Sequence, residues 1–219
     1  MLERLSRAQG LSPLERHYDY ARYLFACGHT WGRDVLDVAC GSGYGSELLV
    51  RYGAQSVVGV DISPDALDEA RRLHAAPGVT FLEGDALDPP VSGPFGTVVS
   101  LETIEHLAEP EAALDRFARL LAEDGVLVCS TPDRSQANPG ASRNDAPKNP
   151  FHLVELSRPE LRRALEANFH EVELYRQLCR LPGHRPARVS DALERATAWP
   201  TRLPLPSLYL VAVCRRPRR

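Results

Sequence analysis

Residues 35–49 constrain the fold of this chain more than any other segment. A short apolar run, Val-Leu-Asp-Val, is followed by three closely spaced glycines and then by a pattern typical of a helix. The glycines are Gly41, Gly43 and Gly45. Because glycine lacks a Cβ atom, the backbone can turn tightly there and a ligand can approach it closely. The segment predicts a strand, a turn and a helix, with a small molecule bound at the turn.

Asp37 indicates the charge of that molecule. It lies where the apolar run ends, and neither Lys nor Arg lies between it and Gly45. A carboxylate there would repel a pyrophosphate, and phosphate-binding loops usually recruit positive partners. The glycine spacing also departs from the dinucleotide pattern Gly-x-Gly-x-x-Gly. We therefore expect a ligand that carries an ammonium or a sulfonium group.

The pattern Asp-x-x-x-Gly-x-Gly-x-Gly resembles the S-adenosylmethionine loop of class I methyltransferases, and the resemblance continues in order over roughly residues 15–178. It implies a Rossmann-like α/β fold with a seven-stranded sheet whose last strand is antiparallel. It also implies S-adenosylmethionine as the cofactor, with Asp37, Gly41 and Gly43 in its site. A Rossmann-like domain for another nucleotide is the alternative.

A second strand, residues 56–60, ends on Asp61, twenty positions beyond Gly41. An acid at this distance can reach the ribose hydroxyl pair of a nucleotide, and the matching acid does so in the family. A third strand, residues 79–83, leads to Asp85, which the resemblance places near the exocyclic amine of adenine. The other side chains expected at the cofactor are those of Ile62, Ala86 and Leu101.

Strand patterns alternate with helical patterns along the chain, which predicts a parallel sheet covered on both faces. Each helix is expected to pack its apolar side on the sheet. Further strands are expected over residues 95–101, 125–132, 169–178 and 207–214, and helices over residues 12–27, 64–74, 109–121 and 159–168.

The length of 219 residues suits one domain, residues 1–219, and leaves no room for a second full one. Two stretches, residues 133–150 and 181–206, are rich in turn-forming residues and are expected as loops. Long loops in a compact domain often cover a functional site. We expect these loops and a helical cover within residues 1–30 to form the roof of the site.

The N-terminal helical segment supplies one more expected cofactor residue. Tyr18 and Tyr20 match the helix that closes over the cofactor in sugar- and nucleoside-modifying methyltransferases. The resemblance implies that Tyr20 hydrogen-bonds the methionine carboxylate of S-adenosylmethionine. Packing of an aromatic stripe is the alternative.

The most specific chemistry follows the fourth strand. Glu102, Glu105 and His106 stand at i, i+3 and i+4, so that on a helix, or a turn entering one, their side chains converge on one face. Two carboxylates and an imidazole resist burial together unless a cation or a proton joins them. A further histidine, His152, comes directly after the loop of residues 133–150.

This set resembles the Glu-x-x-Glu-His and the distant His that bind a divalent metal in small-RNA 3′-terminal 2′-O-methyltransferases. Its first part also resembles the ubiquinone-pathway O-methyltransferases. The resemblance implies Glu102, Glu105, His106 and His152 as ligands of Mg²⁺, Mn²⁺ or a later transition metal. Two alternatives stay open: a metal-free site in which His106 or His152 is the general base, with Glu105 beside it, and a purely structural role.

Composition restricts the partners. The formal net charge is −3, and the basic tail of residues 215–219 has no second basic stripe to form a nucleic-acid track. No segment approaches the ~20 apolar residues of a membrane span. The first residues lack an apolar signal core, and the five cysteines are scattered. We expect a cytoplasmic monomer or homodimer with a small-molecule acceptor, and neither nucleic acid nor membrane as a partner.

The function expected from these features is S-adenosylmethionine-dependent O-methylation of a small polyhydroxylated acceptor, a sugar or nucleoside in natural-product biosynthesis, with possible help from a divalent metal. A phenol or catechol O-methyltransferase, and an N- or carboxyl-methyltransferase without metal, remain alternatives because one fold serves all of these reactions. A cofactor-binding regulatory subunit is the alternative that is not an enzyme.

Overall fold

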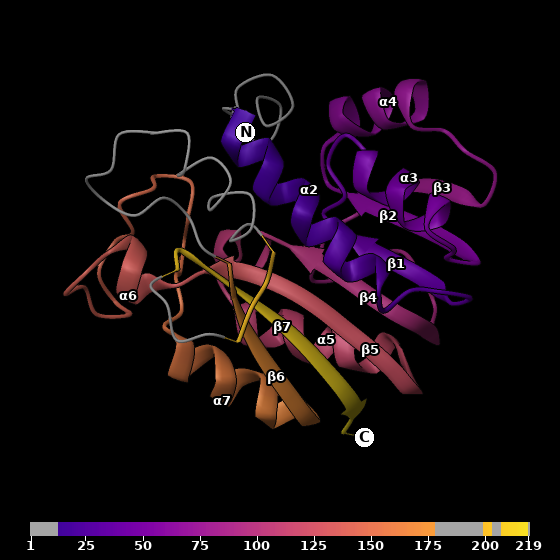
Figure 1. Cartoon of the computed structure of the whole chain (residues 1–219). Coiled ribbons are helices and arrows are strands. Elements are labelled where there is room, and N and C mark those ends of the chain that lie inside the picture. Colours follow the sequence, from indigo (N-terminus) through magenta and orange to yellow (C-terminus); the bar gives the residue numbers. More distant parts are fainter. Residues whose placement is uncertain (1–12, 178–198, 203–206, 219) are drawn as a thin grey trace.

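A seven-stranded sheet forms the centre of the protein, in the order β3-β2-β1-β4-β5-β7-β6 (Figure 1). The computed structural model describes residues 13–177, 199–202 and 207–218. Strand β7 runs antiparallel to both of its neighbours, whereas the pairs from β3 to β5 are parallel. The predicted Rossmann-like class I sheet is thereby confirmed. The strands are β1 (Asp34–Val38), β2 (Ser56–Asp61), β3 (Val79–Glu83), β4 (Phe95–Leu101), β5 (Leu121–Pro132), β6 (Phe169–Gln177) and β7 (Tyr209–Pro217).

The helices begin where the sequence offers capping residues. Ser63 accepts a hydrogen bond from the backbone N of Ala66, and Pro64 opens α4. Ser157 and Glu160 form a capping box at the start of α7. The helices are α2 (Pro13–Cys27), α3 (Tyr44–Arg51), α4 (Pro64–Leu73), α5 (Pro110–Leu120), α6 (Arg134–Ala137) and α7 (Arg158–Asn168), with a 3₁₀ turn, η1 (Ile104–His106).

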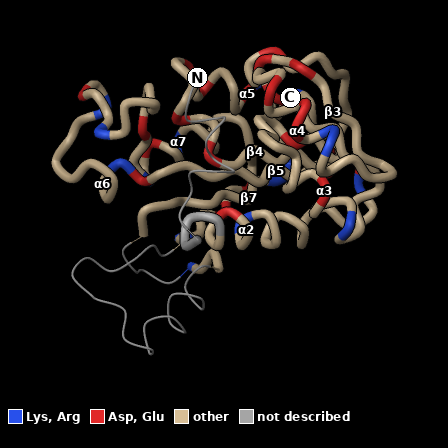
Figure 2. The backbone as a smooth tube through the Cα atoms, turned by 90° about the horizontal axis from the view of Figure 1, so that it is seen from above, with Lys and Arg blue, Asp and Glu red and all other residues tan. Residues whose placement is uncertain are grey.

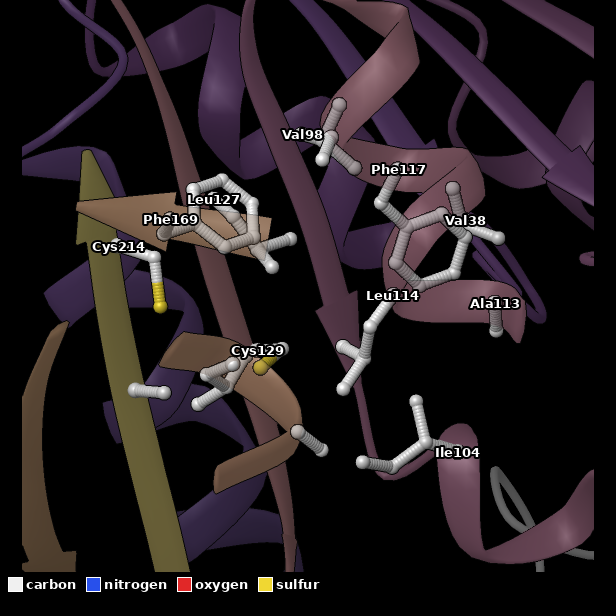
Figure 3. Close-up of a cluster of buried hydrophobic side chains, with 14 of the residues drawn as sticks. Val38, Val98, Ile104, Ala113, Leu114, Phe117, Leu127, Cys129, Phe169 and Cys214 are labelled. Atoms are coloured by element: carbon white, nitrogen blue, oxygen red, sulfur yellow. The ribbon is translucent and has the colours of Figure 1, made fainter. Parts of the chain in front are cut away.

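Two hydrophobic layers hold the helices on the sheet. On one face, α5 and α7 pack over β4, β5 and β7 through side chains such as Phe117, Leu127 and Phe169 (Figure 3). On the other face, α2 and α3 pack through side chains that include Phe25 and Leu49. With both faces covered, the central strands carry nearly continuous apolar residues.

Most predicted element boundaries agree closely with the structure. Strands β3 and β4 have the predicted bounds, whereas β5 begins at Leu121 because Leu121 pairs with Phe95 beyond a register shift. The loop predicted over residues 133–150 contains the short helix α6. The loop predicted over residues 181–206 lies mostly outside the described residues. No helix in the described part has the length and apolar character needed to cross a membrane.

Candidate active site

The glycine-rich turn joins β1 to α3, and its glycines serve different purposes. Gly43 has a φ of 82°, and a Cβ atom on it would come within 2.6 Å of the Phe81 ring. A Cβ atom on Gly45 would come within 2.0 Å of the Tyr23 ring. Gly41 also has a positive φ of 56°, but nothing lies within 4 Å of where its Cβ would stand. Two glycines therefore allow close packing, and the third leaves open space above the turn.

Asp37 is fully buried beneath this turn. Its carboxylate accepts a hydrogen bond of 2.7 Å from the Ser46 hydroxyl and a longer one of 3.3 Å from the Tyr23 hydroxyl. Burial raises the pKa of Asp37 to about 7, although these two hydrogen bonds act in the opposite direction. A cationic ligand at the turn would stabilise the ionised form of this carboxylate.

Asp61 ties the end of β2 to the same turn. One carboxylate oxygen accepts from the backbone N of Gly41 and the other from the backbone N of Ser63, both at 2.9 Å. Ile62, the next residue, is 49% exposed, and the Asp85 carboxylate accepts from the backbone N of Leu87. The expected cofactor residues thus lie at or just beyond the carboxyl ends of four adjacent strands: Asp37, Gly41, Gly43, Asp61, Ile62, Asp85, Ala86 and Leu101.

This donor set fits S-adenosylmethionine. Acidic side chains suit the ammonium, the sulfonium and the ribose hydroxyls, and the apolar side chains of Ile62, Ala86 and Leu101 suit an adenine ring. The open space above Gly41 gives the ligand room beside the backbone. The carboxyl edge of a parallel sheet is also where ligands of open α/β folds bind.

The structure distinguishes the tyrosines of α2. Tyr20, predicted at the cofactor, is 42% exposed. Tyr23 is buried, covers Gly45, points its hydroxyl at Asp37 and makes an edge-on ring contact with Tyr44. Sequence reasoning missed Tyr23 because helical periodicity does not tell which side chain meets the turn. The cofactor contact of Tyr20 stays a prediction.

The structure separates Glu102 from the other predicted metal ligands. Glu102 has a φ of 52°, and the 3₁₀ turn begins only at Ile104, so the helical spacing does not apply. The Glu102 carboxylate accepts a hydrogen bond of 2.7 Å from the Ser130 hydroxyl and lies 4.0 Å from the guanidinium of Arg22. It therefore faces β5 and α2.

Three of the four predicted metal ligands lie close together. They are Glu105, His106 and His152. Each offers one ligand atom such that all three atoms lie within 4.8 Å of one another. Glu105 is fully buried and accepts a hydrogen bond from the Thr131 hydroxyl at 3.0 Å. Nδ1 of His106 donates to the carbonyl oxygen of Phe151, because a carbonyl can only accept. Nε2 of His106 lies 3.9 Å from Oε1 of Glu105 and, in the neutral imidazole, carries the lone pair.

Glu155 completes the surroundings of His152 and was not predicted. Nδ1 of His152 donates to Oε1 of Glu155 at 2.6 Å, and Nε2 accepts from the side-chain amide of Asn149 at 2.9 Å. The buried Glu155 carboxylate also accepts from the side-chain amide of Asn138. Its only signal in the sequence is a carboxylate three residues after the histidine, in a segment without regular structure.

These contacts allow two kinds of chemistry. A carboxylate oxygen and two imidazole nitrogens are suitable ligands for a divalent cation, and carboxylate support of a ligand imidazole is usual in metal sites. The same support also suits a histidine that accepts a proton from a hydroxyl group.

Residues 36–129 match the family described as "Methyltransferase domain". The chain is 35% identical over 155 residues to a probable S-adenosylmethionine-dependent methyltransferase of Mycolicibacterium smegmatis, covering 70% of this chain and 57% of the relative. It is 37% identical over 111 residues to a ubiquinone biosynthesis O-methyltransferase of Psychrobacter arcticus, covering 48% of this chain and 42% of the relative. The chain spans about half the length of the curated relatives that it matches.

Among solved structures, the fold is similar to that of the N-methyltransferase NodS from Bradyrhizobium japonicum in complex with S-adenosyl-L-homocysteine. The TM-score is 0.65 at 17% identity, and the match covers 97% of this chain and 92% of NodS. At this identity the likeness concerns the fold alone. Strand order, the acidic glycine turn and the family match agree: the chain carries a class I S-adenosylmethionine-dependent methyltransferase domain.

Proposed function

We propose that this protein transfers a methyl group from S-adenosylmethionine to a hydroxyl of a small polyhydroxylated acceptor, such as a sugar or a nucleoside. The cluster of Glu105, His106 and His152 is the observation that carries the proposal. It follows β4 and adjoins β5, at the sheet edge that also bears the glycine turn. The cofactor supplies an electrophilic methyl group, and the chain must place a hydroxyl oxygen in line with it.

The cluster supports a divalent cation as the group that holds the acceptor. Glu105, His106 and His152 would be its protein ligands, and a bound cation favours the deprotonated form of a hydroxyl on it. Thr131 orients Glu105, Phe151 fixes the tautomer of His106, and Glu155 does the same for His152. Residues preorganised in this way lose little freedom when the acceptor binds.

A metal-free mechanism is the second candidate, and the hydrogen bond between His152 and Glu155 favours it. A carboxylate at 2.6 Å stabilises the imidazolium that forms when Nε2 takes a proton from the acceptor. In either mechanism Asn149 must release Nε2, because its amide now donates to the lone pair that a cation or a proton would take.

The test is a screen for transfer of labelled methyl from S-adenosylmethionine into pooled sugars, nucleosides and catechols, with and without EDTA. A cation site predicts that EDTA abolishes turnover, that Mg²⁺ or Mn²⁺ restores it, and that Glu105→Gln, His106→Ala and His152→Ala each lose activity together with metal affinity. The exposed His170 gives the matched control, His170→Ala, which should retain both. Methyl transfer into catechols alone would favour the phenol-type alternative.

The metal-free mechanism predicts a different result. EDTA has no effect, one histidine matters far more than the other two residues, and the rate follows one ionisation in the range typical of imidazole. Glu102→Gln distinguishes the fourth predicted ligand. Because Glu102 contacts Ser130 and Arg22, we expect Glu102→Gln to keep its metal affinity. If Glu102 is a ligand, the variant should lose activity and metal affinity as Glu105→Gln does. If methyl is transferred into none of the pools, the proposed function is contradicted.

A further inference from the structure

A cavity of about 390 Å³ opens between α6, the start of α7 and the ends of β5 and β6. Figures 1 and 2 both show α6 and α7 as neighbours at this end of the protein. The volume is at the lower end of the ~300–1,000 Å³ of small-ligand sites. Its lining includes Asp133, Ser135, Arg158, Arg162, Arg176 and Ser207.

The charge of this lining is positive. Three arginines, Arg158, Arg162 and Arg176, line the cavity together with one acidic residue, Asp133. The Arg162 guanidinium also pairs with the Glu166 carboxylate at 3.2 Å, at the solvent-exposed side of α7. The Asp133 carboxylate already accepts two hydrogen bonds from Ser135 at the start of α6. Three arginines around one small cavity therefore indicate an anionic ligand.

Buried polar atoms point to the same ligand independently. Ser207 is only 4% exposed, yet its hydroxyl oxygen has no hydrogen-bond partner in the described part of the chain. Nε of Arg158 is also buried and, within the same residues, has no partner. Leaving a buried donor unsatisfied costs about 1–3 kcal/mol, so such groups usually mark a missing ligand or water. An oxyanion in the cavity would accept from both.

We propose that this cavity binds a phosphoryl group. Planar guanidinium groups donate pairs of hydrogen bonds that match phosphate oxygens, and a serine hydroxyl adds one more donor. The donors come from α7, from β6 and from Ser207, two residues before β7, and a phosphate presents several oxygens in these different directions. Two sources share this chemistry: a phosphate ester carried by the acceptor, and free inorganic phosphate.

The position of the cavity relates it to the acceptor. Asp133 lies two residues after Thr131, whose hydroxyl donates to Glu105 of the cluster. Arg158 lies six residues after His152, a span of at most about 21 Å even for a fully extended chain. The cavity by itself supports the binding of a phosphoryl group. The further inference that this phosphoryl group is part of the acceptor rests on the proposed function.

Titration of the full chain with inorganic phosphate, followed by calorimetry, tests the site directly. We expect the double variant Arg158→Gln/Arg162→Gln to weaken binding by about tenfold or more, since two charge-assisted contacts are lost. Arg163→Gln, at an exposed neighbour on the same helix, is the matched control and should bind as the wild type does. Ser207→Ala removes only a hydroxyl and should weaken binding several-fold without risk to the fold.

The proposal is overturned if the folded wild type does not bind phosphate, or if the double variant and Ser207→Ala bind it equally well. Circular dichroism monitors folding. If the double variant does not fold, the phosphate affinity of Ser207→Ala alone tests the proposal. None of these measurements requires methyl transfer. Phosphate binding without any methyl transfer would therefore count against the proposed function alone.

The methyl-transfer screen separates the two sources. If the phosphate belongs to the acceptor, sugar phosphates are methylated in preference to their parent sugars, the double variant removes this preference by raising KM, and inorganic phosphate competes. If free phosphate is the ligand, sugars and sugar phosphates are methylated alike and inorganic phosphate does not compete with them.

Discussion

Nδ1 of His152 lies 2.6 Å from Oε1 of Glu155, so a buried carboxylate fixes the tautomer and the orientation of an imidazole in the candidate active site. The carboxylate is itself held by the side-chain amide of Asn138, at the end of α6. This pair connects the loop after β5 to the cluster of Glu105, His106 and His152.

Glu155→Gln should lower methyl transfer by about 10- to 100-fold, the usual effect of losing the partner of a ligand or base imidazole. The substitution keeps the shape of the side chain but removes the charge that Nδ1 of His152 faces. Measurement of kcat and KM separately checks this, and kcat should carry most of the loss. Glu171→Gln, at an exposed position on β6, is the control. An unchanged kcat would rule out a role for Glu155 in positioning His152.

Asp37 should make stability depend on pH. Burial raises its pKa from the ordinary 3.8 to about 7, so the folded state holds a proton that the unfolded state has already released between these values. The free energy of unfolding should therefore fall as the pH rises from about 4 to about 7, by on the order of 4 kcal/mol for this group alone.

Urea unfolding of the wild type and of Asp37→Asn over this pH range measures the Asp37 contribution as a difference. The variant should lack the slope, and the exposed-site control Asp65→Asn should keep it. Affinity for S-adenosylmethionine should run the other way and rise with pH up to about 7, because the ionised carboxylate attracts the cationic ligand. Parallel slopes in wild type and Asp37→Asn would contradict the raised pKa.

Asp61→Ala should weaken S-adenosylmethionine binding by about 10- to 100-fold, since a charge-assisted contact with the ribose is lost. The variant also releases the backbone N atoms of Gly41 and Ser63, which the carboxylate now holds. Calorimetry with Asp61→Asn helps to distinguish the two effects, because its single amide oxygen can still accept from one of the two backbone N atoms while the charge is removed. Equal affinity in all three proteins would remove Asp61 from the cofactor site.

Arg22→Met should destabilise the fold by about 3–5 kcal/mol, because removing one partner leaves a buried charge uncompensated. The Arg22 guanidinium is 3% exposed, donates to the Gln177 side chain at 2.6 Å and pairs with Asp19. It also lies 4.0 Å from the Glu102 carboxylate. Urea unfolding measures the loss. Arg51→Met, whose side chain is 71% exposed, should change stability by at most about 0.5 kcal/mol.

The sequence by itself determined the individual strands and helices and the cofactor turn. Apolar runs, capping residues and glycine spacing are local signals, and the strand over residues 79–83 and the helix that begins at Pro64 follow from them directly. The parallel order places the ends of successive strands at one edge, so Asp37 and Asp61 could be predicted beside the same ligand. These features depend on neighbours that are close along the chain.

Only the tertiary structure decided which side chains meet across the chain. Glu102 has a left-handed backbone and its carboxylate accepts from Ser130, and it is not one of the three residues whose ligand atoms lie within 4.8 Å of one another. Glu155 contacts His152, and Tyr23 contacts Asp37. No periodic pattern in the sequence relates the two residues of either pair. Such contacts depend on the rotamers and loop conformations that the packed core imposes, and the spacing of residues along a chain carries no direct record of either.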